Sequence, residues 1–84
     1  MKFLADIDIM PLPELLDPQG KSVKEALHSM GLDSIAEVRI GKHIQLEIEA
    51  ANENMASETI EKACAKLLMN PITENYRYVI RLRE

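Results

Sequence analysis

The 84-residue sequence is poor in the residues that most often build a binding or catalytic site. Cys64 is its only cysteine, which excludes a disulfide within the monomer and is typical of a reducing compartment. One cysteine and two separated histidines, His28 and His43, give no zinc-ligand spacing. Tryptophan is absent and aromatic residues make up 4% of the chain, which leaves few rings for nucleic-acid bases to stack on. The three glycines lie far apart, so no phosphate-binding loop is present.

The net charge and the length of the chain further limit which partners and which location the protein can have. The net charge of −4 argues against nucleic acid or an anionic membrane as the main partner. No apolar run approaches the roughly 20 residues of a membrane helix, and acid appears too early for a signal peptide, so we expect a cytoplasmic protein. We expect residues 1–84 to form one small domain that buries only about 60–65% of the surface exposed by the unfolded chain. Without disulfides or zinc, such a domain is expected to gain stability by association.

Alternation of apolar residues with period two predicts four strands. The alternating apolar positions are Phe3, Ala5, Ile7 and Ile9; Ala36, Val38 and Ile40; Ile44, Leu46 and Ile48; and Tyr76, Tyr78, Ile80 and Leu82. Gly41-Lys42 separates the second strand from the third, which predicts a hairpin. Both apolar sets of this hairpin are even-numbered, so it needs a loop of odd length or a bulge.

Two helices are predicted between these strands. Asp17 before Pro18 is a strong helix start, and Gly31 is a natural left-handed end. Asn52 or Asn54 caps the second helix, which Asn70-Pro71 ends. The apolar stripes are Val23, Ala26, Leu27 and Met30 in the first helix, and Ile60, Ala63, Cys64, Leu67 and Leu68 in the second. Gly20 costs about 1 kcal/mol relative to alanine in a helix, which indicates an irregular turn or a close approach to its backbone.

The order βαββαβ predicts an α+β fold of the ferredoxin-like type, with one antiparallel sheet and two helices on one face. In this fold the last strand lies beside the first, which sets three arginines near two aspartates on the helix-free face. These residues are Arg77, Arg81, Arg83, Asp6 and Asp8. We interpret them as ordinary surface ion pairs rather than as an acid–base site.

No nucleophile–base pair emerges from the sequence. Cys64 lies on an apolar stripe and is expected to be an inert core thiol, whereas His28 and His43 are expected on the solvated surface. Two loop stretches exceed what folding requires and are candidate partner-docking sites. Their residues are Asp17, Pro18, Gln19, Gly20, Lys21, Arg39, Gly41 and Lys42. Alternatively, the two stretches are only a helix cap and a turn. As docking charges, Arg39 and Lys42 are expected to be exposed and to contribute little to stability.

Four motifs in register cover nearly the whole chain. They are L-D-P-Q-G-K at 16–21, A-L-H-S-x-G at 26–31, V-R-x-G-K at 38–42 and K-L-L-x-N-P at 66–71. Together they resemble the small subunit of phosphoribosylformylglycinamidine synthase, the PurS family. The chain departs from the pattern at residues 10–15, where many relatives carry a run that contains lysine and glycine.

The resemblance implies a protein that has no active site and binds no cofactor. The family joins a glutaminase subunit to a large synthetase subunit, which uses ATP and Mg. The complex converts formylglycinamide ribonucleotide to its amidine with nitrogen from glutamine. The resemblance also implies a homo-oligomer, typically a dimer, that helps ammonia pass between the sites. An alternative of another class is a small-molecule-sensing regulatory module of the ACT type, which shares the βαββαβ order and which Gly20 keeps open.

Overall fold

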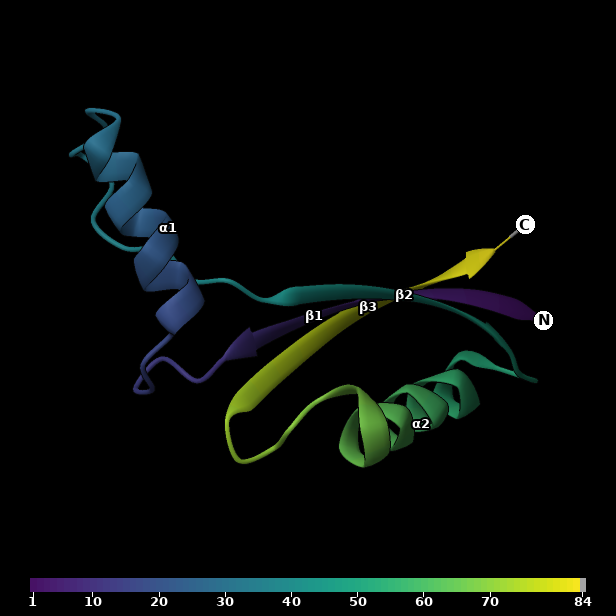
Figure 1. The fold of residues 1–84 in the computed structure, drawn as a ribbon. Helices are drawn as coiled ribbons and strands as arrows, with labels where there is room; N and C mark the ends of the chain where they lie inside the picture. The colour runs from purple at the N-terminus through teal and green to yellow at the C-terminus, as the bar shows by residue number, and fades with distance from the viewer. Residues whose placement is uncertain (84) are drawn as a thin grey trace.

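A computed structural model describes residues 1–83 as a three-stranded antiparallel sheet, with one helix on a face and another projecting away (Figure 1). The elements, in order, are β1 (Lys2–Pro11), α1 (Pro18–Ser29), β2 (Lys42–Glu49), α2 (Glu53–Ala63), the π-helical turn η1 (Cys64–Leu68) and β3 (Glu74–Arg83). The strand order is β2–β1–β3, so the first strand is central and the last strand lies beside it, as predicted. The α+β class, the antiparallel sheet and the two helices are therefore confirmed.

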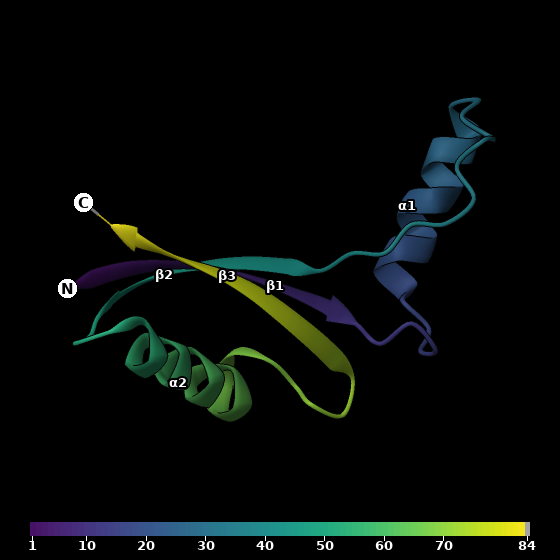
Figure 2. The same cartoon turned by 180° about the vertical axis from the view of Figure 1, so that it is seen from behind.

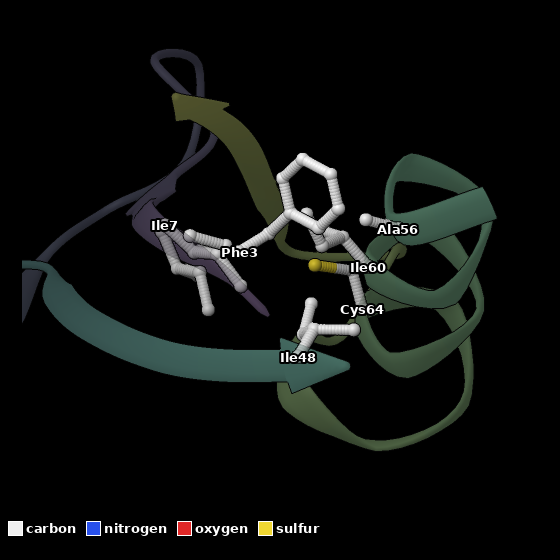
Figure 3. Close-up of a cluster of buried hydrophobic side chains, with 8 residues drawn as sticks. Phe3, Ile7, Ile48, Ala56, Ile60 and Cys64 are labelled. Atoms are coloured by element: carbon white, nitrogen blue, oxygen red, sulfur yellow. The ribbon is translucent and has the colours of Figure 1, made fainter. Parts of the chain in front are cut away.

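The core lies between β1 and α2. Alternate residues of β1 are buried on the face that α2 covers, and they are Phe3, Ala5, Ile7 and Ile9. The register sets Phe3 opposite Ile48 of β2 and Leu82 of β3. Figure 3 shows Phe3 and Ile48 gathered with Ile60 and Cys64 in one cluster. The period-two pattern therefore predicted the buried face correctly.

Both helices begin as the sequence predicts. The side chain of Asp17 caps α1 and Pro18 is its first residue, where a missing N–H costs no hydrogen bond. Gly31 follows α1 with φ +88°, the left-handed conformation that favours glycine. Asn52 caps α2, with its side-chain oxygen accepting the N–H of Met55 at 2.9 Å.

The strand predicted over residues 36–40, and its hairpin at Gly41-Lys42, do not form within this chain. The segment instead runs directly into β2 (Figure 2). The reason is hydrogen bonding, because the Ile40 N–H donates to Asp17 and the Arg39 guanidinium donates to the loop after β1. These contacts hold the segment against the start of α1 rather than against a strand edge.

The prediction that both helices cover the sheet is wrong for α1. This helix stands beyond the end of β1, with residues 32–40 running back beside it (Figures 1 and 2). Its apolar stripe is mostly exposed, as the 73% exposed Met30 shows, and only Leu27 is half-buried. The face of the sheet is consequently covered by α2 alone.

The apolar stripe of the second helix is confirmed except at Leu67, since Leu68 still packs against the core. Ile60 and Cys64 are fully buried, whereas Leu67 is 83% exposed. At Cys64 the helix widens into η1, which closes when the Met69 N–H donates to the Cys64 carbonyl at 3.2 Å. This bond spans five residues, so the phase of the α-helical stripe is lost and Leu67 turns outward.

Candidate functional site

Asp17 joins the two sequence stretches that the motifs single out. Its Oδ1 accepts the Gly20 N–H at 3.0 Å, and its Oδ2 accepts the Ile40 N–H at 2.8 Å. One carboxylate thus ties the first turn of α1 to a segment 23 residues further along the chain. The bond from Ile40, followed by that from Gly20, stabilises the charged form and lowers the pKa of the Asp17 carboxyl.

Arg39 ties the same segment to the loop after β1. Its guanidinium donates to the carbonyl of Leu12 at 2.7 Å and to that of Leu15 at 3.1 Å, and it reaches the Pro11 carbonyl at 3.5 Å. The residue is half-buried. The expectation of an exposed charge is therefore wrong for Arg39, because its donors bind backbone carbonyls whose positions a pattern of side chains cannot reveal.

Two glycines allow close backbone approaches at the junction where the start of α1 and the end of β1 meet residues 38–41. A Cβ at Gly20 would collide with the carbonyl oxygen of Val38, and one at Gly41 would collide with the carbonyl of Ile9 and the sulfur of Met10. The close approach expected at Gly20 is confirmed. Both glycines are thus required by packing between elements rather than by their own dihedral angles.

The remaining candidates lie on the outside of the junction. Pro18, Gln19, Lys21 and Lys42 are exposed. The Lys42 ammonium lies 3.8 Å from the Glu74 carboxylate and donates to the carbonyl of Leu68 at 3.4 Å. The structure therefore divides the candidates into an inner group that fixes α1 and an outer group that is accessible.

A hollow lies between α1 and the returning segment, residues 32–40. Leu16 and Lys21 of the first motif line it, together with Leu15 and Lys24, which the motif analysis missed. Leu16 is 76% exposed, although it is a large apolar side chain. The available signal was two adjacent leucines in a loop with no strand or helix to bury them.

The helix-free face of the sheet carries the predicted ion pairs. Arg77 lies 3.7 Å from Asp8, and Arg81 lies 3.8 Å from Asp6. Arg83 differs from the prediction, because it contacts Glu47 at 3.4 Å. These side chains are partly or largely exposed, so each pair contributes little to stability.

His43 lies on this same face, on β2, and is exposed as expected. Its Nδ1 is 2.7 Å from Asp8 and its Nε2 is 3.5 Å from Asp6. The contact with Asp8 raises the pKa of His43. Gln45 donates to Asp6 at 2.9 Å, and this bond, assisted by the nearby Arg81 charge, lowers the pKa of Asp6.

His28 and Cys64 are both part of the structure. His28 is half-buried, with its Nε2 2.8 Å from the Ile35 carbonyl, so the expectation of a solvated surface residue is wrong. The returning segment, which covers this side of α1, is the reason. Cys64 is fully buried as expected, and burial raises the pKa of its thiol, which keeps it protonated.

Residues 1–83 contain neither a metal-binding cluster nor a membrane-spanning helix. No group of three or more histidine, cysteine, aspartate or glutamate side chains in this range is arranged to hold a metal ion. In the same described range, no helix combines the length and the hydropathy needed to span a membrane.

Comparison with known proteins decides the family. Residues 4–82 match the family model PurS, described as phosphoribosylformylglycinamidine (FGAM) synthase. The chain belongs to the PurS family. The resemblance expected from the four motifs is confirmed, and the ACT-type alternative is not favoured.

Individual PurS proteins agree with this assignment. Phosphoribosylformylglycinamidine synthase subunit PurS of Synechocystis sp. is 42% identical over 72 residues, which are 86% of this chain and 72% of that protein. Its counterpart in Bacillus subtilis is 42% identical over 66 residues, 79% of this chain and 77% of that protein. Among solved structures, PurLQS from Thermotoga maritima contains a chain with a TM-score of 0.89 at 33% identity, covering 96% of this chain and 99% of that chain. The elongated fold of this PurS-family chain is thus shared with relatives.

Proposed function

We propose that this chain is the non-catalytic small subunit of phosphoribosylformylglycinamidine synthase in de novo purine biosynthesis. The match of residues 4–82 to the PurS family carries the proposal. The likeness to a chain of the T. maritima PurLQS structure supports a role within an assembly.

In this role the chain bridges a glutaminase subunit and a synthetase subunit. Ammonia released from glutamine passes to the synthetase site, where formylglycinamide ribonucleotide becomes its amidine. ATP and Mg act in the large subunit and are not bound by this chain. We place the assembly in the cytoplasm and treat residues 1–84 as one domain.

The inner and outer residues of the junction have different roles in partner docking. Asp17, Gly20 and Arg39 fix the direction of α1 through contacts within the chain. The outer residues are exposed and available for a partner, and they are Pro18, Gln19, Lys21 and Lys42. The exposed Leu16 beside them adds apolar surface of the kind that interfaces bury.

A second copy of the chain is the other proposed partner. The radius of gyration is 16.4 Å, against about 12 Å for a compact chain of this length. The exposed apolar stripe of α1 can contact another copy. So can the partly buried apolar residues on the face of the sheet that α2 covers.

Reconstitution of the complex tests the subunit role. Amidine formation is measured with the glutaminase and synthetase subunits, with and without this chain, using either glutamine or ammonia as nitrogen donor. We expect omission to abolish most glutamine-dependent activity and to spare ammonia-dependent activity, because only the former requires docking of the glutaminase. Unchanged glutamine-dependent activity without the chain would defeat the proposal, as would hydrolysis of glutamine or ATP by the purified chain alone.

A further inference from the structure

One whole edge of the sheet is open along β3. The strand pairs with β1 in one continuous register, from Lys2 opposite Arg83 to Pro11 opposite Glu74. Within residues 1–83 no strand lies on the other side of β3. Its ten residues contain no proline, and the unbroken register contains no bulge. Proline and bulges are two usual means of blunting an edge, so this edge presents N–H and carbonyl groups ready to pair.

The same strand gathers arginines on an acidic protein. Three of the ten lysines and arginines are Arg77, Arg81 and Arg83, although the chain as a whole carries a charge of −4. Their ion-pair distances of 3.4–3.8 Å exceed the 2.7–2.9 Å or so of charge-assisted hydrogen bonds. The Arg77 side chain is 88% exposed. The guanidinium groups therefore keep donors that an added carboxylate can use.

An apolar position separates two of these cations. Val79 lies between Arg77 and Arg81 on the helix-free face and is 68% exposed. On the opposite face, Tyr78 and Ile80 are only half-buried under α2. On the helix-free face, every second residue along this edge is therefore cationic, apolar and cationic in turn, at Arg77, Val79 and Arg81.

We propose that the free edge of β3 binds an extended acidic segment of a partner protein by strand addition. Backbone hydrogen bonds to the open edge supply affinity, and alternate side chains supply specificity. The matching segment has the order acidic, any, apolar, any, acidic, so that its carboxylates lie opposite Arg77 and Arg81 and its apolar residue covers Val79. The inference depends on β3 alone and does not require the proposed subunit role.

Charge argues against a second copy as the occupant of this edge. Pairing two β3 strands would bring Arg77, Arg81 and Arg83 of both copies onto one face of a joined sheet. Like charges across a strand pair are destabilising, whereas opposite charges stabilise it. An acidic segment is therefore the better complement.

A labelled peptide tests the pairing. The probe has the core Glu-Thr-Val-Thr-Glu between serine flanks, and its binding to the full chain is followed by fluorescence anisotropy at low salt. We expect measurable binding, and about tenfold weaker binding when both glutamates are lysines, from two reversed cross-strand pairs. Two further peptides are methylated on their backbone nitrogens, one at the odd-numbered and one at the even-numbered positions. Only one of the two should lose binding, because every second N–H group of a strand faces its neighbour.

Two matched variants locate the site. Arg77→Gln removes a cation from β3, and Lys62→Gln removes an exposed cation from α2. We expect Arg77→Gln to weaken binding about threefold, the size of one cross-strand charge pair, and Lys62→Gln to leave it unchanged. No binding at millimolar protein, equal binding of the acidic and lysine peptides, or equal binding of the two methylated peptides would overturn the proposal. Loss of self-association in Arg77→Gln alone would assign the edge to a second copy and would also overturn it.

Discussion

At the scale of single residues, the Asp17 carboxylate accepts N–H groups from two distant parts of the chain. Asparagine is normally as good a helix cap as aspartate, but its amide would present N–H donors where Oδ2 now accepts the Ile40 N–H. We expect Asp17→Asn to lower the melting temperature followed by circular dichroism. Asn52→Asp is the matched control, because the cap to Met55 is the one hydrogen bond that the Asn52 side chain makes within residues 1–83, and it should melt close to the parent chain.

The pH dependence of this same variant gives a second measurement. The Asp17 pKa lies below its ordinary value of 3.8 in the folded chain, so its stabilising contribution is complete above that value and is lost as pH falls through the lowered pKa. Asparagine does not titrate. The gap in melting temperature between the parent chain and Asp17→Asn should therefore be steady near neutral pH and shrink below about pH 4. A gap that does not change in acid would show that the charge is irrelevant.

Single-residue patterns predicted some of these roles and not others. The cap at Asp17, the burial of Cys64 and the crowding at Gly20 follow from local rules about helix starts, apolar stripes and glycine cost. The partners of Arg39 do not, because they are carbonyls of a loop whose path depends on the folded chain. A side-chain pattern contains no information on where such carbonyls point.

At the scale of elements, the contact between α1 and its returning segment is close enough to reverse a usual rule. Alanine in a helix is ordinarily about 1 kcal/mol more favourable than glycine. At Gly20, however, an added Cβ would meet the Val38 carbonyl, so we expect Gly20→Ala to destabilise the chain in urea. Ser22→Ala, at an exposed position of the same helix, should be neutral or stabilising. A Gly20→Ala variant as stable as the parent would mean that the two segments separate freely.

The elements that sequence reasoning misplaced share a physical cause. A period-two pattern shows that residues 36–40 alternate between two environments, but it does not show which strand lies beside them. Similarly, the stripe over Leu67 assumes an unbroken α-helix, and no sequence signal marks the π-helical turn of η1. The central strand and the α2 stripe were predictable because their partners follow from burial alone.

At the scale of the whole molecule, the absent hairpin and the projecting helix are one feature. Folding back at Gly41-Lys42 would place residues 36–40 beside the free edge of β2 and would carry α1 toward the sheet. In this chain those residues enter β2 without folding back (Figure 2), which leaves the positions beside the edge of β2 open to the same segment of a second copy. We therefore interpret Gly41-Lys42 as the hinge of an arm exchanged between two chains.

Lengthening the hinge tests this interpretation, because a short hinge keeps the arm open and a longer one lets it fold back. The parent chain is expected to sediment as a dimer at micromolar concentration. Inserting about four glycine and serine residues between Gly41 and Lys42, a length that is ample for a hairpin loop, should give a monomer with unchanged helix content. The same insertion between Pro71 and Ile72, in an exposed turn, should leave the dimer intact. A monomeric parent chain would exclude the exchange outright. A hinge variant that remains dimeric would show that the copies associate through another surface, because a closed arm has no vacant edge to fill.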